Sequence, residues 1–184
     1  MKGVRPQQMN GMKTKWRPWV VTRLLSAATV VVTVAACEAP GDGTLPSEDD
    51  VLTYFESDRR IEAMVVGNVA SLIVYQDANQ LRRGGALWAK VGPYVFLFSE
   101  ETQQLFADYD GLAGVRVTTM VGSAEVASAL LAHSELSDVL WARSLNIAGR
   151  ARLEGTNRMT LLEDLVEWGE AHTEFTYNEV YTRR

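Results

Sequence analysis

The hydrophobic and polar positions divide the chain into an apolar leader, a polar linker and a body in which apolar residues mostly recur every three or four positions. Residues 24–36 contain no charged side chain, whereas residues 38–47 are rich in proline, glycine and acidic residues and have little to bury. The pattern predicts three regions. These are a signal or anchor segment over residues 1–37, a flexible spacer over 38–47 and a single domain over 48–184.

The longest predicted helix spans residues 48–83. Ser47, followed three residues later by Asp50, has the spacing of an N-cap, and the glycine pair at 84–85 suits a helix end. The middle of the segment, residues 64–75, is apolar on nearly all sides. This run is too short to cross a bilayer, so we expect it to be a central core helix.

A dense aromatic run lies within residues 86–106, where Pro93 interrupts a helix and Ser99, followed by two glutamates, favours a new helix start. The aromatic side chains have two interpretations. Filling of the core is favoured because Phe is usually buried, and the alternative is an exposed docking patch. The candidate patch residues are Trp88, Tyr94, Phe96 and Phe98.

The remaining segments complete a mainly α prediction. Residues 114–122 alternate as a strand would, although a short helix also fits, so a small β element near residues 94–121 stays open. Helices are predicted over 124–132 and 137–153, and a capping-box pattern at 160–163 opens the last helix. We therefore expect an antiparallel bundle of about four to five helices.

The last predicted helix has two different faces. Its apolar stripe contains Leu161, Leu165, either Trp168 or Gly169, and finally His172. We interpret the opposite, acidic face as solvated or as a landing surface for a basic partner, rather than as a cation site. The acidic residues are Glu163, Glu167, Glu170 and Glu174.

Charge separates the chain sharply at Cys37. Six of the 18 basic residues precede it and none of the 23 acidic residues does, so the part after Cys37 has a net charge near −11. So acidic a domain is repelled by phosphate backbones, which argues against nucleic-acid binding and favours a basic or apolar partner. The six preceding basic residues are Lys2, Arg5, Lys13, Lys15, Arg17 and Arg23.

Few residues offer chemistry. A single cysteine rules out an internal disulfide and a cysteine-rich metal site, and no phosphate-binding glycine loop occurs. Of the two histidines, His133 and His172, neither belongs to the Glu-x-x-His pairs of di-iron bundles, and His172 fits a hydrogen-bonded core position. We predict a non-catalytic protein without catalytic, metal-binding or cofactor-binding residues.

The leader has the layout of a secretory signal, with a basic start, an apolar stretch within the usual ~7–15 residues and small residues at the end. Its last four residues, Val34-Ala35-Ala36-Cys37, resemble the lipobox of bacterial lipoproteins. The resemblance covers only the tether. It implies cleavage before Cys37 and acylation of both the Cys37 sulfur and the new amino terminus, and more than one acyl chain is needed for stable anchoring.

An uncleaved membrane anchor is the alternative interpretation of the leader. Extended back to Val20, the apolar run could nearly span a bilayer, with Arg23 reaching the interface beside Trp16 and Trp19. Both interpretations place the domain in the bacterial cell envelope, outside the cytoplasm.

Three functions are open to such a protein. We favour a non-catalytic accessory or scaffold subunit that docks on a larger membrane complex of secretion, respiration or photosynthesis, with an integral-membrane or basic protein as partner. A carrier would enclose a lipid in a cavity lined by Met64, Val65, Leu72 and Phe96. An enzyme would have a cleft in which His133 or His172 meets a carboxylate.

Overall fold

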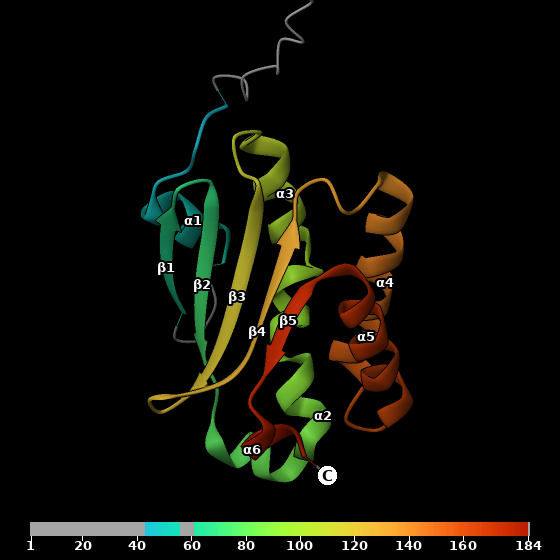
Figure 1. The fold of residues 1–184 in the computed structure, drawn as a ribbon. Helices are drawn as coiled ribbons and strands as arrows, with labels where there is room; N and C mark the ends of the chain where they lie inside the picture. Colours follow the sequence, from blue (N-terminus) through green and yellow to red (C-terminus); the bar gives the residue numbers. More distant parts are fainter. Residues whose placement is uncertain (1–42, 56–60, 184) are drawn as a thin grey trace, which may run out of the picture. The chain divides into compact units, whose positions relative to one another are not determined.

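Five strands form one mixed sheet, and helices cover one of its faces (Figure 1). The computed structural model describes residues 43–55 and 61–183, all within a unit that extends over residues 38–184. The strands are β1 (Ile61–Val66), β2 (Val69–Tyr75), β3 (Gly114–Val121), β4 (Ala124–Ala132) and β5 (Glu174–Tyr177). The helices are α1 (Glu48–Tyr54), α2 (Ala78–Leu97), α3 (Glu100–Asp108), α4 (Asp138–Glu154), α5 (Met159–His172) and α6 (Glu179–Thr182).

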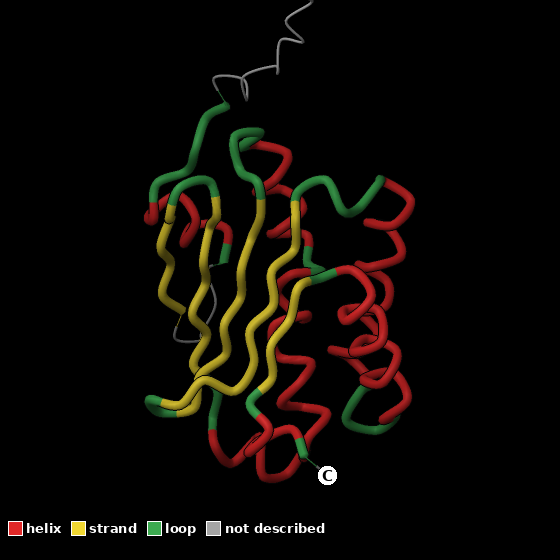
Figure 2. The backbone as a smooth tube through the Cα atoms, in the orientation of Figure 1, coloured by secondary structure: helices red, strands yellow, loops and turns green. Residues whose placement is uncertain are grey.

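The spatial order of the strands follows the chain, β1-β2-β3-β4-β5. Strands β2 and β3 are parallel, and the other neighbours are antiparallel. A parallel pair needs a long crossover, and α2 and α3 supply it between β2 and β3. Helices α4 and α5 form the second long connection, from β4 to β5. Figure 2 shows the strands in front of these helices.

The prediction of a mainly α bundle is wrong, because this is an α/β fold. The segment predicted as a core helix over residues 64–75 belongs to the β1–β2 hairpin. Its turn is Gly67-Asn68, and Gly67 has a φ of 63°, which tight two-residue hairpin turns require. Strand β2 is buried on one face and half-buried on the other. Such a strand gives a continuous apolar run, which periodicity alone does not distinguish from a buried helix.

The second error has the same cause. Residues 124–132, predicted as a helix, form β4, which lies between β3 and β5. The strand interpretation of residues 114–122 is confirmed as β3, and Gly122, with a φ of 60°, makes the turn between the two strands. The β structure therefore extends well beyond the small element considered near residues 94–121, while the aromatic run there is helical.

The aromatic run lies in α2, which continues through Pro93 to Leu97. The break in this helix is instead at Gly85, whose φ of 65° and ψ of −163° kink the chain. Pro93 itself is buried. The interruption predicted at Pro93 is therefore wrong, whereas the break predicted at the glycine pair does occur.

Several helix starts are confirmed. Ser47 and Asp50 form the reciprocal capping box of α1, although this helix ends at Tyr54 rather than continuing to residue 83. The Ser99 side chain accepts a hydrogen bond from the Thr102 amide at the start of α3. Helix α5 begins at Met159 without a side-chain cap, so the predicted capping box at residues 160–163 does not form.

The core lies between the inner face of the sheet and the helices. Inner-face residues such as Leu72, Val117 and Leu131 are fully buried in one cluster with residues of α2, α3, α4 and α5. Helices α2 and α5 approach each other closely at Gly169. A Cβ atom at Gly169 would lie 2.4–2.5 Å from three ring carbons of Tyr94. In the described part of the chain, no helix is long and apolar enough to span a bilayer.

We expect Gly169→Ala to lower the free energy of unfolding by about 1–3 kcal/mol, because the added methyl group overlaps the buried Tyr94 ring. Gly149→Ala is the matched control in α4, where a Cβ would meet nothing within 4 Å. This change should stabilise by about 0.5–1 kcal/mol through helix propensity. Urea unfolding measures both, and equal effects of the two changes would contradict the close packing.

Candidate functional site

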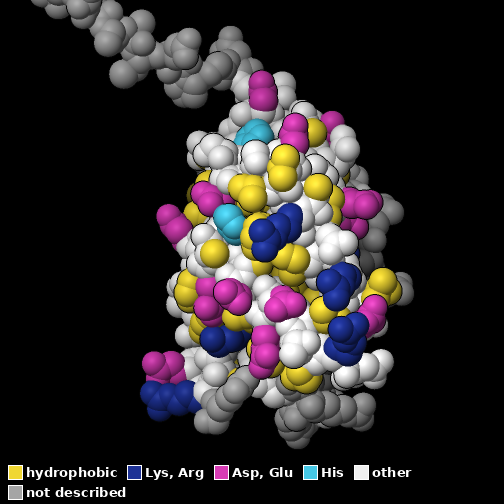
Figure 3. Space-filling view, turned by 90° about the vertical axis from the view of Figure 1, so that its right-hand side faces the viewer, with side chains coloured by type: hydrophobic (Ala, Val, Ile, Leu, Met, Phe, Trp, Pro, Cys, Tyr) yellow, Lys and Arg dark blue, Asp and Glu magenta, His cyan; other side chains and the backbone are white. Residues whose placement is uncertain are grey.

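Helices α4 and α5 form a helical hairpin that leaves an open groove of about 540 Å³. The side of the domain that carries these helices mixes apolar, acidic, basic and histidine side chains (Figure 3). Helix α4 lines the groove with Arg143, Asn146 and Ile147, and α5 lines it with Asp164, Glu167, Trp168, Ala171 and His172. The groove therefore combines apolar surface, including the Trp168 indole, with charged and polar side chains.

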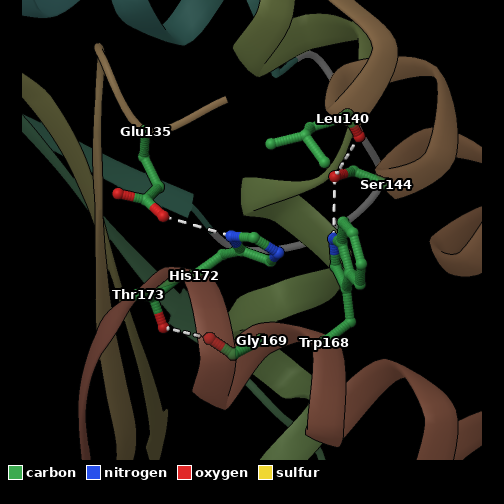
Figure 4. A network of polar contacts seen from close by, with 7 residues as sticks. All are labelled: Glu135, Leu140, Ser144, Trp168, Gly169, His172 and Thr173. Carbon is green, nitrogen blue, oxygen red and sulfur yellow. Dashed lines mark hydrogen bonds and ion pairs between the residues drawn. The ribbon is translucent and has the colours of Figure 1, made fainter. Parts of the chain in front are cut away.

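Trp168 is held in place by a buried serine of the opposite helix (Figure 4). Its indole Nε1 donates a hydrogen bond to Ser144 Oγ at 2.8 Å, and Ser144 Oγ donates to the Leu140 carbonyl, also at 2.8 Å. Ser144 is fully buried. Because buried donors need acceptors, this chain of hydrogen bonds fixes both the orientation of the indole and the pairing of α4 with α5.

Two cationic or titratable side chains contact the Trp168 ring. The Arg143 guanidinium lies over it, with Cζ 4.4 Å from the ring centroid, in cation–π geometry. The His172 ring lies one turn along α5, with a centroid separation of 4.3 Å and a tilt of 51°. The sequence placed either Trp168 or Gly169, together with His172, on the apolar stripe of α5. Gly169 is buried, whereas Trp168 and His172 are only half-buried and line the groove.

His172 also meets a carboxylate. Its Nδ1 lies 3.1 Å from Glu135 Oε1, and Glu135 comes from the connection between β4 and α4 (Figure 4). Only 18% of the His172 side chain is exposed. No sequence signal indicated Glu135, because it lies on a loop outside any motif and approaches His172 only through the tertiary fold.

The two acidic residues of the groove take part in none of the ion pairs found among the described residues. Asp164 and Glu167 are exposed, and neither is within 4.0 Å of a basic group in the described part of the chain. Glu154, Glu170 and Glu179, by contrast, are each paired with a nearby Lys or Arg.

The four glutamates predicted as one acidic face separate in space. Glu167 lines the groove, and Glu163 is exposed on α5. Glu170 is half-buried on another flank, where Lys90 Nζ lies 3.3 Å away. Glu174 is in β5 and faces away from the helical layer, on the same side of the sheet as its register partner Leu130. Only Glu167 of the four is therefore available to a ligand of the groove.

The predicted aromatic residues belong mainly to the core. Tyr94 and Phe98 are buried, with 0% and 1% exposure, and Trp88 and Phe96 are half-buried against the same core cluster. Tyr94 and Phe98 cannot contribute to an exposed docking patch. Cys37, the predicted lipidation site, lies outside the described residues.

The second histidine has a structural environment. His133 Nδ1 lies 2.8 Å from the Leu112 carbonyl, and its ring stacks on Phe106 with centroids 4.5 Å apart. Within the described ranges, no three His, Cys, Asp or Glu side chains are arranged to hold a metal ion.

A pair of tyrosines ties α2 to the last strand. The hydroxyls of Tyr94 and Tyr177 are 2.5 Å apart, and Lys90 Nζ lies 4.7 Å from the centroid of the Tyr177 ring. Burial raises the pKa of Tyr94 to about 12. Burial, together with the neighbouring Tyr94 hydroxyl, also raises the pKa of Tyr177. These hydroxyls are thus held in their neutral form by the fold.

Comparisons with models of protein families, with curated proteins and with solved structures find no match to this chain.

The tyrosine pair predicts a loss of stability at alkaline pH. Unfolded tyrosine titrates near pH 10, and Tyr94 in the folded chain titrates near 12, so the neutral pair stabilises fully below about pH 10. We expect the free energy of unfolding to fall between about pH 10 and 12. Tyr94→Phe should flatten this fall, as measured by urea unfolding across that range. An unchanged slope in Tyr94→Phe would show that this pair does not cause it.

Ser144→Ala should lower the free energy of unfolding by about 1–3 kcal/mol, because it leaves the Trp168 N–H without its buried acceptor. The test is a double-mutant cycle with Trp168→Phe, which removes the donor. The Ser144→Ala penalty should be smaller in the Trp168→Phe background. Strictly additive penalties would show that the hydrogen bond contributes nothing to the pairing of α4 with α5.

Proposed function

We propose that this chain is a membrane-anchored accessory protein of the bacterial cell envelope, without catalytic activity of its own, that docks on a larger membrane assembly. The lipobox-like Val34–Cys37 segment and the basic leader support the anchoring. The observation that supports the docking role is the α4–α5 groove, where Trp168 lies among exposed charged side chains on a well-packed domain. Tyr, Trp and Arg are the residues that most often dominate binding energy at protein interfaces.

Anchoring makes a groove of this size useful. A domain confined to a membrane surface meets its partner at a high effective concentration, so a modest interface is sufficient for stable association. The spacer over residues 38–47 would let the domain reach an integral-membrane partner. Secretion, respiratory and photosynthetic complexes are candidate hosts, and no residue selects among them.

The carrier function has less support. Met64 pairs with Ser71 and points to the outer face of the sheet, where 43% of it is exposed. Leu72 points to the inner face and is fully buried in the core. These two residues, proposed to line one cavity, are therefore on opposite sides of the sheet.

An enzyme is the second candidate, and the His172–Glu135 pair beside the groove favours it. A histidine oriented by a carboxylate can act as a general base. The groove lining contains no Ser, Thr or Cys side chain, so this base would have to activate water. Hydrolysis of a set of small esters that is lost in His172→Gln would support this candidate over the first.

The anchoring is tested by intact mass of the protein extracted from membranes. We expect the mass of residues 37–184 plus the lipid groups of an acylated Cys37. Cys37→Ser removes the thiol that would be modified, so its product should retain the leader and lack the lipid. If the chain without substitutions has the mass of its full length and carries no lipid, lipidation is contradicted. The uncleaved membrane anchor is then the remaining interpretation of the leader.

The docking is tested by gentle solubilisation of the membrane. We expect the chain to co-purify with a membrane complex at a fixed stoichiometry. A lone monomer under these conditions, at a detergent concentration that keeps other membrane complexes intact, would contradict the accessory function.

A further inference from the structure

We propose that the α4–α5 groove binds an arginine-containing basic segment of the partner, and that Arg143 occupies the place on Trp168 that the partner's guanidinium takes. This inference rests on the proposed docking function and names the chemistry of the partner. Three features of the groove lead to it: the cation already on the indole, the carboxylates beside it, and the overall charge.

Arg143 forms only part of the interactions that a guanidinium can make in this groove. It is exposed and stacks over Trp168 at 4.4 Å. Among the described residues, however, no carboxylate lies within 4.0 Å of it, although Asp164 and Glu167 line the same groove. The indole face is thus covered by a cation that satisfies neither acidic residue.

An arginine that enters from a partner can stack on the indole and pair with a carboxylate at the same time. Its planar guanidinium can stack on the indole and donate paired hydrogen bonds to a carboxylate, whereas a lysine ammonium offers no such fork. Asp164 is one turn of α5 before Trp168 and so lies on the same helix face, and Glu167 lines the same groove. Both carboxylates are therefore in the groove that holds the ring. The incoming residue therefore gains contacts that Arg143 does not make.

Charge favours a cation over an anion. The lining contains two acidic side chains and one arginine, and the nearby His172 is already paired with Glu135. The part of the chain after Cys37 has about 11 more acidic than basic residues, a difference that follows from the sequence counts. Its field attracts basic segments and repels acidic ones.

The experiment uses the full chain in non-ionic detergent and a fluorescent Gly-Arg-Gly-Arg-Gly peptide, with anisotropy as the readout. A peptide with citrulline in place of arginine keeps the shape and removes the charge, and a Gly-Glu-Gly-Glu-Gly peptide tests an anionic occupant. We expect binding of the arginine peptide only, weakening as salt is added.

Two sets of substitutions should change the affinity for the arginine peptide in opposite directions. Asp164→Asn with Glu167→Gln should weaken arginine-peptide binding roughly three- to tenfold. Arg143→Met keeps an apolar side chain over the indole and removes the competing charge, so it should tighten binding by about two- to fivefold. The matched control, Glu100→Gln with Glu101→Gln on α3, makes the same charge change outside the groove and should leave binding unchanged.

The inference is overturned if Arg143→Met weakens binding, if the glutamate or citrulline peptide binds equally well, or if the α3 control weakens binding as much as the groove variant. None of these results contradicts the docking function, provided that the chain still co-purifies with a membrane complex. Loss of co-purification in the unchanged chain, with peptide binding intact, would instead remove the docking function and keep the groove's preference for arginine.

Discussion

The burial of the inner face of the sheet beneath α2 is the interaction on which the rest of the structure depends. Helix α2 contacts β3 and β4 of the sheet and also α4, α5 and α6, so it joins the sheet to these helices. Its side chain Tyr94 fills the space that Gly169 leaves open in α5 and reaches Tyr177 of β5. One buried side chain therefore relates α2, α5 and the edge strand.

The groove follows from this arrangement. Helix α5 turns its buried stripe, with Leu162, Leu165 and Gly169, toward the core, and this leaves Asp164 and Trp168 directed toward α4. The hydrogen bond from Trp168 to the buried Ser144 then sets the spacing of the two helices. Charged side chains remain at the surface, where their desolvation costs little, and surround the half-buried indole of Trp168.

Local signals in the sequence predicted the N-caps of α1 and α3, at Ser47 and Ser99, because a cap depends on residues only a few positions apart. Strands are harder, since their partners lie far along the chain. Strand β4 is a run of small and apolar residues that would also suit a helix. Its identity is decided by hydrogen bonding to β3 and β5, and no local spacing encodes that pairing.

The sequence by itself determined the division of charge at Cys37, the basic and apolar leader and the N-caps at Ser47 and Ser99, because these are properties of neighbouring residues. The tertiary structure alone decided the sheet and the composition of the groove. Glu135 and His172 are 37 residues apart, and Ser144 and Trp168 are 24 apart. Such contacts form only when packing in a shared core offsets the entropy lost in closing long loops. The spacing of residues along the chain does not show whether that free-energy balance is favourable.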